Sequence, residues 1–237
     1  PALTSWTATQ LGVTLSVSNN ATFTAPALAT MTNVLATVRV GAKVTLPGLA
    51  SYTYTLVANP TVFDVANAGS ELNLPALATL TFNDSFDHGI TAIVSATDSG
   101  HIDIPLLTTV ALGISHRFEL NLATGGTIDA AGLASANVMN VTVAAGSNLT
   151  LPSLTSLTGA RVTVAGTLSL PNLANLAGSV VTLNGAGSLT APALTTLANN
   201  TISLANTSQM ALPALTSWTA TQLGVTLSVS NNATFTA

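Results

Sequence analysis

The chain contains no cysteine, so neither a disulfide nor a thiolate-bound metal can stabilise it. Charged side chains are only 5% of the 237 residues, and the formal net charge is −4. The cations are Arg39, Lys43, Arg117 and Arg161. Four cations cannot line a track of phosphates, which excludes nucleic acid as an expected partner.

Long apolar runs are also absent, because Thr, Ser or Asn interrupts each one within a few residues. We therefore expect no membrane-spanning helix. Apolar residues nevertheless make up 48% of the chain, the opposite of the balance found in disordered proteins. The composition thus favours a packed apolar core. Hydroxyl and amide side chains, and not charged ones, are expected to interact with water at the surface.

What the sequence does contain is an identical duplication. Residues 1–25 recur letter for letter as residues 213–237, which defines a unit of 212 residues. The pattern predicts one continuous solenoid over 1–237, with 1–212 as one full tandem unit and 213–237 as the start of the next. We expect this chain to be a window on a longer array of such units.

A shorter repeat inside this unit is marked by proline, with alanine in its place once. The anchors are Pro1, Pro26, Pro47, Pro75, Pro105, Ala131, Pro152, Pro171, Pro192 and Pro213. They are separated by nine intervals of 19 to 30 residues. Proline lacks the N–H that a sheet requires, so its recurrence at one phase predicts a corner at each anchor.

Side chains at fixed distances from the anchor alternate in character. Two residues after every anchor stands leucine: Leu3, Leu28, Leu49, Leu77, Leu107, Leu133, Leu154, Leu173, Leu194 and Leu215. The third residue before each anchor is also apolar, and the second is mainly polar. This alternation is typical of strands with one buried face.

We therefore predict an all-β fold, a parallel β-solenoid (β-helix) with about nine coils per 212-residue unit and roughly three short strands per coil. Coils stacked about 4.8 Å apart would advance roughly 43 Å per unit. The alternative fold is a leucine-rich-repeat horseshoe, whose repeats have similar lengths. That fold expects Asn or Cys at a fixed inward position, and the sequence has no such column.

Titratable side chains gather in the middle of the unit. All eight acidic residues and all three histidines fall between 64 and 129, in the stretch that holds the longest coils: Asp64, Glu71, Asp84, Asp87, His88, Asp98, His101, Asp103, His116, Glu119 and Asp129. Loops that bulge from a regular scaffold are the usual place for function. Any functional face is expected here.

The repeat register aligns some of these residues in successive coils. Lys43, Glu71 and His101 stand four residues before their anchors and should form an ion ladder on the surface. Asp103 and Asp129, two before theirs, should stack as like charges. A bound calcium ion, with Asn73 as a further oxygen ligand, would relieve the repulsion, and so would simple solvation.

The run from Asn83 to Gly89 places Asp84, Asp87 and His88 in one loop. An acid, a base or a metal ligand is chemically feasible there, but no nucleophile elbow, HExxH pattern or spaced Cys/His set accompanies them. We read the segment as a solvated loop. The sequence predicts no catalytic residue, no enzyme activity and no cofactor apart from the calcium considered above.

In its Leu/Pro/Val pattern, the chain resembles the β-solenoid stalks of bacterial surface adhesins and filamentous haemagglutinin-like proteins. The LTLPSLTSL-type repeats also resemble receptor-L-domain repeats of fungal wall proteins. The resemblance implies an extracellular or cell-surface scaffold without catalytic activity. The identical duplication predicts that the main partner of the chain is itself, head to tail along a fibre axis.

The sequence is also compatible with three other functions. One is an adhesin-type binding module whose acidic middle coils recognise a glycan or calcium. Another is ice binding by a column of outward threonines, which Asn73, Asp103 and Asp129 interrupt. The third is a carbohydrate-active enzyme, which would need two carboxylates facing each other across a groove.

Overall fold

The structure, a computed structural model, describes residues 2–56, 58–83 and 91–237. A β-turn at each anchor from Pro26 to Pro213 bends the chain. At Pro152, the N–H of Leu154 donates to the carbonyl of Leu151 at 3.3 Å, so the proline occupies the second position of the turn, which suits its fixed φ. The turn recurs from coil to coil, as expected for a proline at a corner.

The described residues form 29 strands and no helix, and the strands lie on three faces. The first face holds β1 (Ser5–Thr7), β4 (Thr30–Thr32), β7 (Ser51–Tyr54), β10 (Thr79–Phe82), β13 (Thr109–Leu112), β16 (Ser135–Asn137), β19 (Ser156–Thr158), β24 (Thr196–Ala198) and β27 (Ser217–Thr219). The second holds β2 (Thr14–Val17), β5 (Leu35–Arg39), β8 (Thr61–Ala66), β11 (Thr91–Thr97), β14 (Arg117–Leu122), β17 (Met139–Val143), β20 (Arg161–Val164), β22 (Val180–Leu183), β25 (Thr201–Leu204) and β28 (Leu227–Val229). The third holds β3 (Thr22–Thr24), β6 (Lys43–Thr45), β9 (Glu71–Asn73), β12 (His101–Asp103), β15 (Thr127–Asp129), β18 (Asn148–Thr150), β21 (Thr167–Ser169), β23 (Ser188–Thr190), β26 (Gln209–Ala211) and β29 (Thr234–Thr236).

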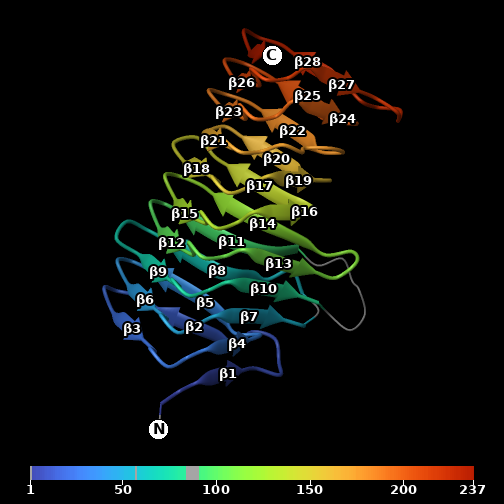
Figure 1. The fold of residues 1–237 in the computed structure, drawn as a ribbon. Coiled ribbons are helices and arrows are strands. Elements are labelled where there is room, and N and C mark those ends of the chain that lie inside the picture. Colours follow the sequence, from blue (N-terminus) through green and yellow to red (C-terminus); the bar gives the residue numbers. More distant parts are fainter. Residues whose placement is uncertain (1, 57, 84–90) are drawn as a thin grey trace.

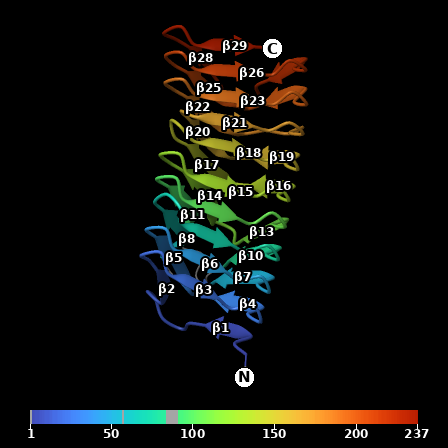
Figure 2. The same cartoon turned by 90° about the vertical axis from the view of Figure 1, so that its left-hand side faces the viewer.

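Successive coils stack in parallel from one end of the molecule to the other (Figures 1 and 2). The second face is a single ten-stranded sheet in chain order. Nine of its strands precede residue 213 and the tenth, β28, lies in the second copy, as predicted for nine coils per unit. The fold is therefore an all-parallel β-solenoid. We number the coils 1 to 10 after these second-face strands.

Inward side chains from all three faces form one continuous apolar core. The leucine column belongs to it: eight members, from Leu28 to Leu194, are fully buried. The two outer members differ, since Leu3 is 49% exposed and Leu215 is only partly buried. The column prediction fails at Leu3 because coil 1 has a neighbouring coil on one side only.

The longer coils in the middle extend the second face. There β8, β11 and β14 have 6, 7 and 6 residues, whereas β20, β22 and β25 have 4 each. A register irregularity between Ile93 and Val94 accommodates part of the extra length. The added residues thus widen coils 3 to 5 without interrupting the stacking.

Small residues fill the corner that precedes each third-face strand. Five residues before the anchors stand Ala21, Ala42, Ser70, Gly100, Gly126, Ser147, Gly166, Gly187 and Ser208. A Cβ at Gly126 would lie 2.0 Å from the carbonyl oxygen of Ala96. The backbones of adjacent coils approach too closely at this corner for a larger side chain. The column of small residues has a fixed offset from the anchor, so the sequence does contain a signal for this close approach.

Among the residues that the structure describes, the second face is the only one that joins coil 5 to coil 6 by strand pairing. Within the described residues, no strand pairing links β13 to β16 or β15 to β18, whereas β14 pairs with β17 over five residues. We call this break the seam. It separates coils 1–5 from coils 6–10 on two of the three faces, and it lies where Ala131 replaces the anchor proline.

Candidate functional site

The third face brings the predicted ladder residues into register. Lys43 is the strand partner of Glu71, and Glu71 is the partner of His101. Lys43 Nζ donates to Glu71 Oε2 at 2.8 Å, while His101 Nδ1 lies 2.8 Å from Thr127 Oγ1 in the next coil. The ladder therefore contains the ion pair between Lys43 and Glu71. His101 extends the ladder to the next coil through its hydrogen bond with the Thr127 hydroxyl.

Solvent limits what this ion pair contributes. The Lys43 side chain is 57% exposed and that of Glu71 34%. Exposed pairs of this kind contribute roughly 0 to 1 kcal/mol. Its main physical effect is to favour one register between coils 2 and 3.

Asp103, Asp129 and Asn73 are also strand partners on this face. Asp103 lies opposite Asn73 on one side and opposite Asp129 on the other. Burial, followed by the charge of Asp129, raises the pKa of Asp103; Glu71 adds to the increase and His101 opposes it. The Asp129 carboxylate accepts a hydrogen bond from the Ala131 N–H at 3.1 Å.

The fit of this trio to calcium is incomplete. Asn73 Oδ1 is a buried oxygen without a hydrogen-bond partner, so it has a lone pair to offer. Calcium, however, takes six to eight oxygen ligands. Across residues 2–56, 58–83 and 91–237, no three His, Asp or Glu side chains are grouped to hold a metal ion. Two carboxylates and one amide would leave most ligands to the backbone and water, and calcium stays a prediction.

The second face carries a polar column that we did not identify from the sequence. Its outward members, one per coil, are Ser16, Thr37, Asp64, Ser95, Asn121, Thr142, Thr163, Thr182, Ser203 and Ser228. Arg39 of coil 2 forms an ion pair with Asp64, the member of this column in coil 3. Most members stand ten residues before the following anchor, a spacing that could have revealed the column.

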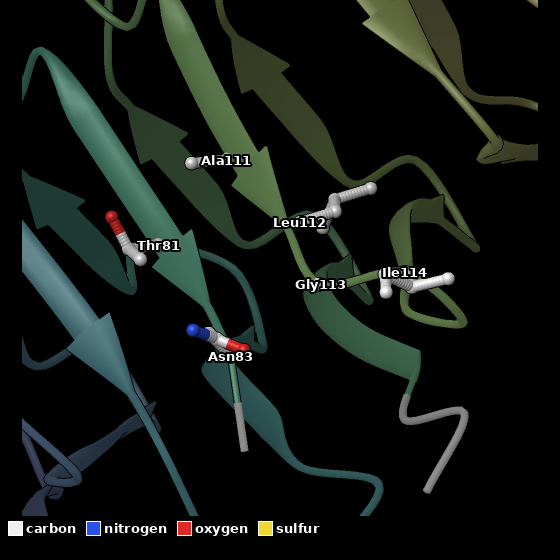
Figure 3. Close-up of a pocket in the computed structure, with 6 residues that line it drawn as sticks. All are labelled: Thr81, Asn83, Ala111, Leu112, Gly113 and Ile114. Carbon is white, nitrogen blue, oxygen red and sulfur yellow. The ribbon is translucent and has the colours of Figure 1, made fainter. Parts of the chain in front are cut away.

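A shallow hollow opens beside the ends of β10 and β13 (Figure 3). It has a volume of about 410 Å³ and is lined by Thr81, Asn83, Ala111, Leu112, Gly113 and Ile114. Ile114 is 94% exposed. The described lining has no titratable side chain, so it can contact an apolar or hydroxyl-rich surface but presents no acid or base.

Other predicted residues lie elsewhere or outside the described chain. Asp84, Asp87 and His88 belong to residues 84–90, which the structure does not describe. His116, one of the titratable residues in the middle of the unit, is buried. A second hollow, of about 320 Å³, lies at the seam and is lined in part by His116, Val110 and Ala136.

The two ends of the solenoid present the duplicated segment in complementary settings. Trp6 pairs with Met31 of the coil that follows it, and Trp218, the same residue of the repeat, pairs with Leu197 of the coil that precedes it. The third face repeats this relationship, with Phe23 opposite Val44 and Phe235 opposite Met210. The first copy thus shows how the repeated segment pairs with the coil after it, and the second copy shows how it pairs with the coil before it.

The described residues include no helix with the length and apolar character needed to cross a membrane. The site and the fold define a parallel β-solenoid with a polar, acidic middle and two open edges. Comparisons of the chain with protein-family models, with curated proteins and with solved structures find no match.

Proposed function

We propose that this chain is a structural protein, a section of an extracellular fibre or surface stalk in which solenoid units continue end to end. The observation that carries the proposal is the shared register of the duplicated segment. Leu15 lies opposite Ala36 of the following coil, and its counterpart Leu227 lies opposite Ile202 of the preceding coil. One coil therefore has a compatible partner on each side, which is the requirement for indefinite stacking.

The pairing geometry also suits a stiff rod. Strand hydrogen bonds in a solenoid run along its axis, and here they connect all ten coils on the second face. The apolar core is continuous beneath them from Ala8 to Leu212. A rod of this kind gains length by adding coils and keeps the same cross-section.

The test is a chain lengthened by one further copy of residues 26–237, placed directly after residue 237. If units continue through one another, electron microscopy will show a rod longer by roughly 43 Å, from nine coils at about 4.8 Å each. The β-sheet circular dichroism per residue should stay constant. A rounded particle, or a loss of signal per residue, would contradict the proposal.

Location at the cell surface is part of this proposal. It predicts that protease added to intact producing cells degrades the protein and that a membrane-impermeant biotin reagent labels it. A cytoplasmic marker protein serves as the control and should stay unlabelled. Protection equal to that of the marker would place the protein inside the cell.

A second candidate function is an adhesin-type binding module centred on coils 3 to 5. The adjacent carboxyls of Asp103 and Asp129 and the hollow beside Ile114 favour it. A glycan array would compare the wild-type chain with an Asp103→Ala/Asp129→Ala variant and with Ser169→Ala/Thr190→Ala, a control on the same face. Signal lost only from the first variant supports binding there; absence of any wild-type signal removes this candidate.

A further inference from the structure

The edge of coil 2 forms a binding site for the duplicated 25-residue sequence. In this structure residues 2–25 occupy it, and each face takes part. The N–H of Ala29 donates to the Thr4 carbonyl at 2.8 Å, and the N–H of Lys43 donates to the Ala21 carbonyl at 2.9 Å. Asn33 Nδ2 adds a buried hydrogen bond to the Ala8 carbonyl at 3.0 Å.

A second segment with the same sequence lies at the other end with that side uncovered. Leu227 and Val229 of β28 are 43% and 44% exposed, whereas their counterparts Leu15 and Val17 of β2 are 7% and 8% exposed. Leu223 is fully exposed, whereas its counterpart Leu11 is 57% exposed. The apolar surface that coil 2 buries in the first copy is therefore still open to solvent in the second.

We infer that the edge of coil 2, formed by β4, β5 and β6, takes residues 213–237 of a second copy of this chain in place of its own residues 1–25. The inference rests on the proposed function, because it assumes that coils of one copy continue on coils of another. The partner is fixed by sequence identity, since every side chain that coil 2 touches in residues 1–25 has an identical counterpart in residues 213–237.

In the 237-residue chain, the exchange gives residues 2–25 the role of a removable cap. When the cap leaves, the incoming copy forms the same hydrogen bonds and apolar packing with coil 2. Joining two copies costs translational and rotational freedom, and release of 25 residues returns conformational freedom. The contacts that the cap loses and the contacts that the incoming copy gains are therefore equal in energy. Whether the cap is bound or released then decides whether chains join, as in domain swapping.

The matched variants follow from the duplication. Trp6→Asp/Phe23→Asp weakens the cap, and Trp218→Asp/Phe235→Asp makes the same changes in the incoming segment. Light scattering after size exclusion should show that the first variant associates at a concentration at least about tenfold lower than the wild-type chain. The second variant should stay at the mass of one copy. Equal behaviour of the two variants would overturn the inference, even if one of them folds poorly.

A disulfide trap reports the geometry directly, because the chain has no cysteine of its own. Thr7 is the strand partner of Thr32, and Thr219 is the counterpart of Thr7. Adjacent strand positions about 4.8 Å apart are within disulfide range. A Thr7→Cys/Thr32→Cys chain should therefore close within one copy and serve as the positive control.

The decisive chain carries Thr32→Cys and Thr219→Cys together with Trp6→Asp/Phe23→Asp. These two cysteines lie near opposite ends of the solenoid, so a 32–219 disulfide forms only between copies. Mass spectrometry should find that linkage as the main product. A 219–219 or 32–32 linkage, or none, would overturn the exchange. The lengthened chain described above would still test end-to-end continuation independently.

Discussion

The ring of Tyr52 packs edge-on against the ring of Phe63, with the centroids 5.1 Å apart. Both side chains are fully buried, and Phe82 and Phe118 extend the aromatic cluster through coils 4 and 5. The Tyr52 hydroxyl has no hydrogen-bond partner inside this cluster. Coils 3 to 5 therefore bury an unsatisfied polar atom among aromatic rings.

Tyr52→Phe should consequently stabilise the protein. Removing an unsatisfied buried hydroxyl recovers its desolvation cost, and we expect the free energy of unfolding to rise by about 1 kcal/mol. Urea denaturation followed by circular dichroism measures this. Tyr54→Phe is the control and should change stability less, because the Tyr54 hydroxyl is not among the buried unsatisfied atoms of the described residues. A destabilised Tyr52→Phe chain would show that the hydroxyl has a partner.

Asp103 should make stability fall as pH rises through the acid range. Burial and the Asp129 carboxylate raise the pKa of Asp103 above its ordinary value of 3.8, so the folded chain holds this proton more tightly than the unfolded chain. The contribution to stability is full below pH 3.8 and is lost as pH rises through the raised pKa.

Asp103→Asn removes that dependence. We expect it to raise the free energy of unfolding at pH 7 by about 0.2 to 1 kcal/mol, the usual cost of like charges in opposing strand positions. Thermal unfolding between pH 3 and 7 would show a flatter profile than the wild-type chain (roughly the range over which carboxyls titrate). Asp98→Asn, which removes an equal charge at an exposed corner, is the matched control variant. An unaltered profile in Asp103→Asn contradicts the assignment.

The leucine column allows one substitution to be compared at two burial levels. Leu154→Ala, in the fully buried part, should cost about 2 to 5 kcal/mol through lost burial and the cavity left behind. Leu3→Ala should cost less than about 1 kcal/mol, because half of that side chain is already exposed. Denaturant titration gives both values. Similar losses at the two positions would mean that coil 1 is covered by something else in solution.

The seam should exchange amide hydrogens faster than the coil boundaries around it. Ile104 N donates to the Asp129 carbonyl at 2.8 Å, but within the described residues Ala130, at the equivalent place one coil later, has no backbone acceptor across the seam. Both residues are fully buried, so burial does not distinguish them. We expect the Ala130 amide to exchange at least about tenfold faster by NMR. Equal protection would show that the third-face pairing continues in solution.

Much of the architecture was predictable because stacking turns sequence offsets into spatial neighbours. Once the anchors were aligned, Lys43 had to lie beside Glu71, and Asp103 beside Asp129, whatever the coil lengths. The nine coils per unit and the roughly three strands per coil followed in the same way. The register of the third face is a one-dimensional property, so it can be read from the chain.

The rest depends on three-dimensional geometry. The exposure of Leu3 follows from its edge position, which the column itself does not encode. His116 has the character of a surface residue in the run His116–Glu119, yet the corner beside Gly113 turns it inward. The seam leaves one trace in the sequence, alanine in place of an anchor proline, and a single substitution of that kind does not by itself indicate a break in strand pairing.

The seam also determines how the solenoid would respond to being stretched. Tension applied along the axis acts on the hydrogen bonds between coils, and everywhere else in coils 1–7 two or three strand ladders share it. At the seam, within the described residues, the pairing of β14 with β17 is the one strand ladder, and the hydrogen bond from the Gly125 N–H to Ser147 Oγ adds to it. A fibre built from such units would contain a weak link at a regular interval, so that a strong pull extends it stepwise and spares the well-bonded segments from tearing.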